Sequence, residues 1–255
     1  MWLVLTAMRH MLKDTCVVVS YYDSRSVDDL LRLLRQLHQQ WSAGFFDLRV
    51  VVNSDQMQKL ELPPELAEIS VEVRENIGFN IGAWHHGWRA NPGYSYYIFL
   101  QDECEIVSNR WLDRYRMLLS KANAGLVGES LLHWASWASF GKKWPEAGAE
   151  CAAIAATHDI ELGPNPTHLQ TLVLGATADC LRATDGFLLA KGKVAAIATE
   201  ILFSRHCIQR GFDVRQTAWR PFEYIGHPQW ASLRSGSASL KWNMAKAVRH
   251  LRQRQ

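Results

Sequence analysis

The chain has 255 residues, of which 48% are hydrophobic and 21% are charged, which is enough to bury the core of one large α/β domain. Its formal net charge of +3 is too small to indicate a nucleic acid as a partner. The five cysteines are odd in number and form no C-x-x-C pair, so they argue against a disulfide framework or a zinc site and favour a reduced, cytoplasmic setting.

The first predicted elements alternate between strand and helix. The apolar run at residues 1–8 is too short to span a bilayer, and we expect a surface helix or a loosely attached leader there. Apolar residues at helical spacing from Val27 to Leu37 predict an amphipathic helix. Asn80 is a plausible N-cap for a second helix that extends to about Arg89. Apolar, β-branched or aromatic runs predict strands at 16–22, 48–52, 69–73 and 96–100.

This alternation predicts an α/β fold. Consecutive strands joined by helices pair in parallel through right-handed crossovers, so we expect a mostly parallel central sheet with helices on both faces. Ligands then bind at the carboxyl ends of the strands. The later part of the chain predicts a helix at 111–121, a strand at 125–128, an irregular stretch at 131–168, a strand at 171–174, a helix at 193–210 and a strand at 212–215.

Several common nucleotide-binding classes lack their motifs here. The turn after the first strand, residues 20–25, has no glycine, which excludes a dinucleotide-binding or methyltransferase domain. No P-loop motif occurs in the chain. The glycine-rich loop of sugar nucleotidyltransferases is absent as well.

An acidic cluster, Gln101-Asp102-Glu103-Cys104-Glu105, directly follows the most hydrophobic predicted strand. Carboxylates at the end of a buried strand repel one another and lose hydration, and a hard divalent cation is the usual compensation. Magnesium or manganese is typically held by one or two carboxylates together with substrate phosphates. The alternative is an acidic turn that caps a helix beginning near Asn109.

With these features the chain resembles the inverting GT-A glycosyltransferases of family 2, especially the rhamnosyltransferase-like branch, over residues 15–217. The resemblance implies one GT-A-like domain over residues 1–255, with a nucleotide-sugar-binding half at 15–130 and an acceptor-side half at 131–225. The segments that carry the resemblance are 17–22, 76–82, 99–103 and 183–187, followed by Glu200 and Gly211.

The resemblance implies a donor site at the first strands. Tyr22 would stack on the donor base and Asn53 would bind its edge, while the segment 76–82 would line the pocket and Arg74 would face the diphosphate. The alternatives are a half-buried strand residue for Tyr22, a turn former for Asn53 and a solvated charge for Arg74. The donor-binding residues expected on this basis are Ser20, Tyr22, Asn53, Arg74, Asn76, Asn80 and Gln101.

The resemblance also assigns a divalent metal, manganese or magnesium. Asp102 and Glu103 match the family's Asp-x-Asp turn, which neutralises the leaving nucleoside diphosphate. The turn departs from the pattern because its first position is Gln101. His227 falls where a late histidine completes the metal shell in some members, although a histidine beside a proline is often an ordinary loop residue.

By the same resemblance, Glu200 is the general base that deprotonates the acceptor hydroxyl, and Asp185 is the second candidate. Glu200 could instead be a charge on the solvent face of its helix. The aromatic stretch between the halves would lie on the acceptor side, because indoles pack against sugar C–H groups, or it could serve core packing. The acceptor-side residues expected there are Trp134, Trp137, His158 and Asp159, with Phe140 and Trp144 nearby.

Two hypotheses for function follow. The first is an enzyme that moves a sugar from a nucleotide-diphosphate sugar to a hydroxyl of a glycan or lipid-linked acceptor, with inversion. The second is a nucleotide- or glycan-binding module that kept the fold and lost the chemistry, as the altered Asp-x-Asp turn would allow. The basic segment 240–255 is either a solvated terminal helix or a contact with the inner face of the membrane through anionic headgroups.

Overall fold

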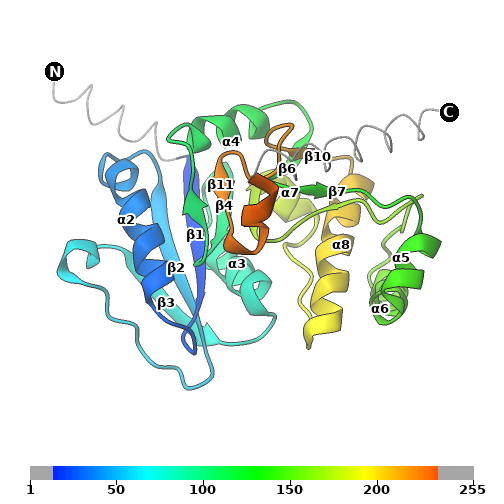
Figure 1. The fold of residues 1–255 in the computed structure, drawn as a ribbon, viewed down its shortest axis with the longest axis horizontal. Helices are drawn as coiled ribbons and strands as arrows, with labels where there is room; N and C mark the ends of the chain where they lie inside the picture. The colour runs from blue at the N-terminus through cyan, green and yellow to red at the C-terminus, as the bar shows by residue number, and fades with distance from the viewer. Residues whose placement is uncertain (1–13, 235–255) are drawn as a thin grey trace.

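A computed structural model describes residues 14–234 of the chain. The predictions for residues 1–8 and 240–255 lie outside the described residues. A seven-stranded sheet in the order β10-β6-β9-β4-β1-β2-β3 forms the centre of the molecule (Figure 1). Its strands are β1 (Thr15–Tyr22), β2 (Asp47–Ser54), β3 (Ser70–Glu75), β4 (Tyr96–Gln101), β6 (Ala124–Gly128), β9 (Val173–Thr177) and β10 (Asp213–Gln216).

The sheet is mostly parallel, as the sequence predicts. β1 pairs in parallel with β2 and β4, β2 with β3, and β6 with β10, whereas β9 runs antiparallel to β4 and β6. The chain builds the sheet outward from β1 in two directions, first through β2 and β3 and then through β4. Such a reversal of strand order leaves a crevice at the carboxyl ends of the strands, where ligands bind in open α/β sheets.

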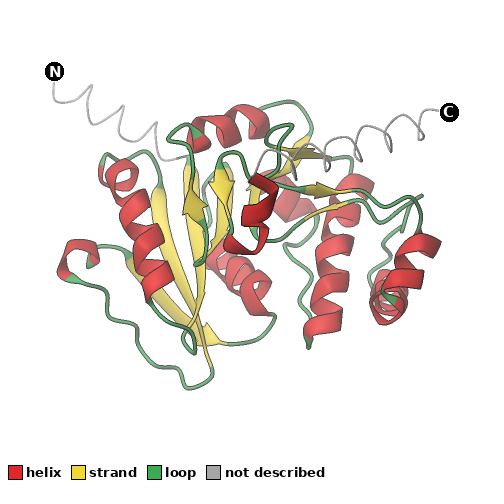
Figure 2. Cartoon of the chain, in the orientation of Figure 1, coloured by secondary structure: helices red, strands yellow, loops and turns green. Residues whose placement is uncertain are grey.

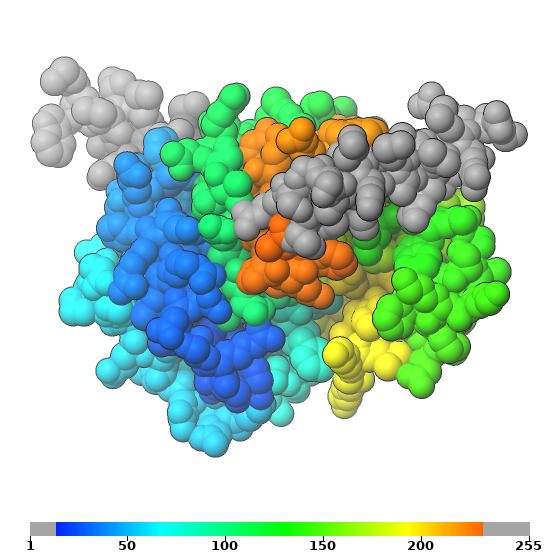
Figure 3. Space-filling model, in the orientation of Figure 1, coloured from blue at the N-terminus to red at the C-terminus, as the bar shows by residue number. Residues whose placement is uncertain are grey.

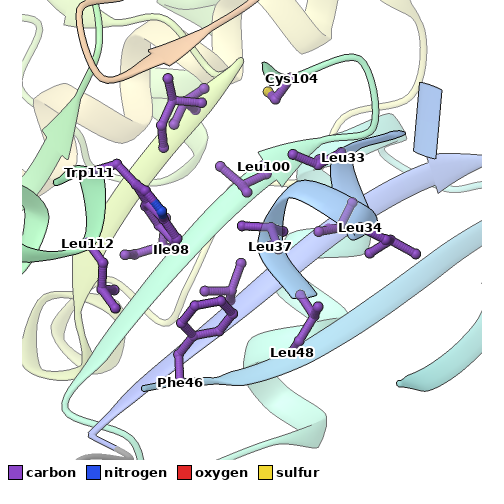
Figure 4. Close-up of a cluster of buried hydrophobic side chains, with 14 of the residues drawn as sticks. Leu33, Leu34, Leu37, Phe46, Leu48, Ile98, Leu100, Cys104, Trp111 and Leu112 are labelled. Carbon is purple, nitrogen blue, oxygen red and sulfur yellow. The ribbon is translucent and has the colours of Figure 1, made fainter. Parts of the chain in front are cut away.

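Helices cover both faces of the sheet, which is also as predicted (Figure 2). One face packs on α2 and α4 around a large apolar cluster that includes Leu34 and Trp111 (Figure 4). The other face packs on α3, α7 and α8 through Trp84 and Phe203. The helices are α2 (Asp28–Ser42), α3 (Phe79–Ala90), α4 (Trp111–Leu119), α5 (Trp137–Lys143), α6 (Pro145–Thr157), α7 (Ala178–Ala183) and α8 (Lys193–Gln209), with short 3₁₀ turns η1 (Pro64–Leu66) and η2 (Pro228–Arg234).

The main disagreement concerns residues 131–168, for which the sequence predicts an irregular stretch. The structure instead has two helices, α5 and α6, which contribute to a third apolar cluster. In this cluster α6 packs against α8, and α5 packs against α6. Short strands lie on either side of these helices, where β7 (Leu131–Leu132) pairs with β8 (His168–Leu169). A second short pair joins β5 (Glu105–Ile106) to β11 (Ile225–Gly226). Both short pairs are antiparallel.

The start of α3 also differs from the prediction that Asn80 caps it. The N-cap is Gly78, whose φ of 78° is left-handed, and Asn80 lies inside the helix. Phe79 also has a positive φ, of 55°, which is uncommon for a bulky residue. An added Cβ on Gly82 would lie 1.9 Å from the Ile77 carbonyl oxygen, so this tight entry into α3 needs glycine at that position.

Within residues 14–234, none of the helices combines the length and the apolar character that crossing a membrane requires.

Candidate active site

Polar side chains gather where β1, β2 and β4 end. The strand register places Ser20 beside Gln101 and Tyr22 beside Asn53. A cavity of about 420 Å³ opens at this edge of the sheet, and we call it the first cavity. It is lined by Ser20, Tyr21, Tyr22, Arg25, Asn53, Asn76, Phe79, Asn80, Gln101, Asp102, Lys193 and Ala196.

A second cavity of about 480 Å³ lies beside the first. The first half of α8 lines both cavities, because Lys193 and Ala196 border the first, and Ile197 and Glu200 border the second. Figure 3 shows the face on which α8 (yellow) lies between α5 (green) and residues of the first half of the chain. The second cavity is lined by Leu132, His133, Trp134, Phe140, Lys143, Trp144, His168, Gln170, Ile197, Glu200, Ile201, Gln229 and Trp230.

Most of the expected donor-binding residues line the first cavity, and Arg74 does not. The Tyr22 hydroxyl donates to Asp55 Oδ2 at 2.6 Å. The buried Asn53 side chain donates to the Phe79 carbonyl at 2.8 Å and accepts from Arg74 Nη1 at 2.6 Å. Arg74 also donates to the Ile77 carbonyl at 2.9 Å. Arg74 therefore holds the entry of α3 against β2 instead of facing the cavity.

Thr171 connects the two cavities, and the sequence analysis does not single it out. Its carbonyl accepts from Asn80 Nδ2 at 2.8 Å and from Gln101 Nε2 at 3.0 Å, and both donors line the first cavity. Its backbone N–H and its hydroxyl both donate to Glu200 Oε2, in the second cavity. These contacts join four distant segments, so no local sequence pattern could have identified Thr171.

Two buried polar atoms, one in the acidic turn and one directly after β11, have no hydrogen-bond partner. Asp102 is 5% exposed and its Oδ2 is unpaired, and burial raises the pKa of this carboxyl to about 6 although Arg25 opposes the shift. His227 is 3% exposed with an unpaired Nε2, and burial lowers the pKa of this imidazole although Glu103 opposes the shift. Unpaired buried polar atoms are costly, so these two atoms mark a place for a ligand.

Glu103 lies near both His227 and Arg25. Its Oε2 is 3.8 Å from His227 Nε2 and 2.7 Å from Arg25 Nη1. Carboxylate oxygens and imidazole nitrogens are ligands that manganese accepts, so the unpaired Asp102 Oδ2 fits a divalent cation. His227 Nε2 would bind the same cation once its proton moved to Nδ1, which now accepts from the Gln229 N–H at 3.3 Å. No three His, Cys, Asp or Glu side chains among residues 14–234 form a preformed metal cluster. A cation here would need further ligands from a substrate.

The two candidate bases lie in different surroundings. The Glu200 side chain is 23% exposed and borders the second cavity, where its Oε1 lies 3.3 Å from His168 Nε2. The Asp185 side chain is 89% exposed, pairs with Arg89 and lines neither cavity. The structure therefore brings Glu200, and not Asp185, to the cavities.

The structure brings some of the predicted acceptor-side residues to the second cavity and leaves others outside both cavities. Trp134 lines the second cavity, and its ring packs edge-on against Phe140. Trp137 lines neither cavity, and its indole N–H donates to the carbonyls of Leu162 and Gly163. His158 is the C-cap of α6 and Asp159 follows it, and both lie outside the two cavities. The lining residues that the sequence analysis missed include Arg25, Lys193, His168, Gln170 and Trp230.

Comparisons with known proteins identify the fold. No family model matches the chain, and no curated protein matches its sequence. Among solved structures it is similar to a mannosyltransferase from Pyrobaculum calidifontis in complex with GDP-Man and Mn²⁺, at 14% identity and a TM-score of 0.53, over 92% of this chain and 64% of that one. It is also similar to glucosyl-3-phosphoglycerate synthase from Mycobacterium tuberculosis in complex with Mn²⁺, UDP and phosphoglyceric acid, at 11% identity and a TM-score of 0.51, over 92% of this chain and 75% of that one.

These likenesses agree with the strand order and with the crevice at the carboxyl ends of the strands. The chain spans 64% of the length of the mannosyltransferase, which is less than two thirds. The protein has the α/β fold of the GT-A glycosyltransferases.

Proposed function

We propose that the protein transfers a sugar from a nucleotide-diphosphate sugar to an acceptor hydroxyl, with inversion at the sugar carbon. The observation that carries this proposal is the pair of cavities that the first half of α8 lines, with a buried acidic turn at one and Glu200 at the other. An inverting displacement needs the acceptor and the leaving group on opposite sides of the sugar carbon. Two adjoining cavities that share one wall provide such an arrangement.

The donor would occupy the first cavity. Tyr22 presents an aromatic ring and Asn53 an amide at the ends of neighbouring strands, which suits a nucleobase. Arg25 and Lys193 supply positive charge to the same cavity, as an anionic diphosphate requires. The first cavity also has polar side chains, from Ser20, Asn76, Asn80 and Gln101.

Asp102 and His227 would hold a manganese or magnesium ion together with the diphosphate, and Glu103 would contribute if it left Arg25. Such an ion supplies charge neutralisation for the leaving diphosphate. In its absence Asp102 Oδ2 and His227 Nε2 stay buried and unpaired. The proposal thus accounts for both atoms with one ligand.

Glu200 would act as the general base and Trp134 would contact the acceptor, a glycan or a lipid-linked glycan. Indole faces suit sugar C–H groups, and the second cavity has Trp144 and Trp230 as well. We further assign the chain to the family 2-like, rhamnosyltransferase-like branch, with a role in polysaccharide synthesis in the cytoplasm. The basic C-terminal segment would provide peripheral membrane contact.

Thermal shift with nucleoside diphosphates tests the donor and metal site. We expect one of UDP, GDP, dTDP or CDP to raise the melting temperature in the presence of Mn²⁺, because a ligand that binds the native state stabilises it. Asp102→Asn should abolish the manganese-dependent part of the shift. Asp179→Asn, at an exposed position on α7 that lines neither cavity, serves as the control and should retain it. Equal shifts in all three proteins, or none with any nucleotide, would contradict the assignment.

A further inference from the structure

The His168 ring has two contacts that together fix where its protons lie. Its Nδ1 is 2.9 Å from the Pro166 carbonyl oxygen, and its Nε2 is 3.3 Å from Glu200 Oε1. A carbonyl oxygen can only accept a hydrogen bond, so Nδ1 must carry a proton. The residue is 4% exposed, so water cannot readily replace either partner.

Proton counting then constrains the pair of His168 and Glu200. A neutral imidazole protonated at Nδ1 has a lone pair at Nε2, which would face the lone pairs of the Glu200 carboxylate. The contact is favourable when one proton lies between the two groups. Either His168 is an imidazolium beside a carboxylate, or it is neutral beside a carboxylic acid.

Thr171 decides between these two states. Its backbone N–H and its hydroxyl both donate to Glu200 Oε2. Two donors to one carboxylate oxygen favour the ionised form of Glu200. The shared proton therefore belongs to His168. Glu200 is also the one carboxylate among the residues that line the second cavity, whose other titratable groups are His133 and Lys143.

The backbone on both sides of this pair is fixed. The Leu169 N–H donates to Ser204 Oγ at 3.1 Å, which joins β8 to α8 next to His168. The Thr171 carbonyl accepts from Asn80 and Gln101 in the first cavity. Glu200 therefore contacts His168 in β8 and Thr171 in the segment before β9. Thr171 in turn is hydrogen-bonded to residues that line the first cavity.

We propose that His168, as an imidazolium, is a positioning residue that together with Thr171 keeps Glu200 ionised and oriented for proton abstraction. The inference rests on the proposed function. In the reaction the acceptor O–H proton would pass to Glu200 Oε1, the acceptor oxygen would bond to the sugar carbon, and the carbon–oxygen bond to the diphosphate would break with its electron pair on the diphosphate.

This arrangement balances charge as the reaction proceeds. The His168 and Glu200 pair begins with no net charge and gains one positive charge when it accepts the proton. The leaving diphosphate gains one negative charge in the same step. The two changes offset each other across the reacting centre, so the reaction develops no net charge. The charged residues that line the first cavity are Arg25, Asp102 and Lys193.

Imidazole nitrogen NMR tests the protonation of His168 without any substrate. The signals are assigned by their loss in His168→Gln. At pH 7 we expect both His168 nitrogens to be protonated in the wild-type protein. In Glu200→Gln the His168 Nε2 signal at pH 7 should change, because the carboxylate that faces this nitrogen is removed. Glu146→Gln, on the exposed start of α6, is the matched control and should leave the signal unchanged.

A neutral His168 at pH 7 in the wild-type protein, or an unchanged Nε2 signal in Glu200→Gln, would overturn the proposal. Both results are independent of whether the protein is a glycosyltransferase.

Hydrolysis of a nucleotide sugar then tests the role in the reaction. The probe is the nucleotide sugar whose diphosphate stabilises the protein, with Mn²⁺. We expect His168→Gln, which can donate a hydrogen bond but cannot be charged, to lower kcat roughly 10- to 100-fold with little change in KM. An unchanged kcat would overturn the proposal. Absence of hydrolysis by the wild-type protein would instead contradict the proposed function, and the imidazole spectra would still decide the state of His168.

Discussion

Glu129, which directly follows β6, is a buried carboxyl outside both cavities. It is 1% exposed and accepts from the Tyr115 hydroxyl at 3.1 Å and from the Tyr224 N–H at 3.2 Å. Burial raises its pKa from 4.5 to about 7, and the hydrogen bonds reduce this shift. The group therefore joins the end of β6 to α4 and to the segment before β11.

A raised pKa in the folded state means that folding favours the protonated carboxyl. Its stabilising contribution is fully present below pH 4.5 and is lost as the pH rises through 7. We predict that Glu129→Gln removes this dependence and stabilises the protein at pH 8 by roughly 2 to 3 kcal/mol relative to wild type. Urea unfolding of both proteins at pH 5 and pH 8 measures this difference in the free energy of unfolding. A parallel loss of stability in both proteins over this range would show that Glu129 is not the source.

Single residues also show where sequence reasoning fails. Asn80 has the residue type and position of an N-cap, but its amide donates to Thr171 across the sheet and Gly78 takes the cap position. Ser20, Tyr22 and Asp102 could be placed correctly at the first cavity, because they end strands whose carboxyl ends meet at one edge. Their partners could not be predicted, since hydrogen bonds between distant segments leave no periodic signal.

At the scale of elements, the entry of α3 depends on glycine. An added Cβ at Gly82 would lie 1.9 Å from the Ile77 carbonyl oxygen and 2.9 Å from Arg74 Nη1. We predict that Gly82→Ala displaces the turn before α3, lowers the free energy of unfolding by roughly 2 kcal/mol or more, and weakens nucleotide binding because Asn53 loses Arg74 as its partner.

Gly141→Ala in α5 is the matched control, since an added Cβ there meets nothing within 4 Å. Alanine favours a helix interior over glycine by about 1 kcal/mol, so this variant should be neutral or slightly more stable. Chemical denaturation and thermal shift with the bound diphosphate measure both effects. Similar behaviour of the two variants would contradict the close approach at Gly82.

The composition of α6 shows why the sequence did not predict this helix. The buried residues of α6 are Ala147, Cys151 and Ala155, which are four apart but small, so its apolar stripe is weak beside that of α2. Pro145 occupies the first helical turn, where proline is tolerated. Large apolar residues at regular spacing made α2 predictable, whereas a helix of alanines that packs on α8 gives little signal.

At the scale of the whole molecule, the sheet was predictable and the second cavity was not. The alternation of strands and helices along the first half of the chain determines parallel pairing and helices on both faces. The second cavity is assembled from α5, β8, α8 and η2, which come from separate parts of the chain. The sequence gives no indication of which of these segments meet, and the aromatic residues could be assigned to the acceptor side only through the resemblance.

The central claim is that the first half of α8 lines both a donor cavity and an acceptor cavity and places Glu200 for inversion. The most direct measurement is ¹H NMR of the sugar first released from the stabilising nucleotide sugar with Mn²⁺, compared between wild type and Glu200→Gln. We predict that the released sugar has the anomeric configuration opposite to that of the donor, and that Glu200→Gln lowers the rate about 100-fold or more while nucleotide binding persists. A sugar released with the donor's configuration, or a variant as active as wild type, would contradict the account.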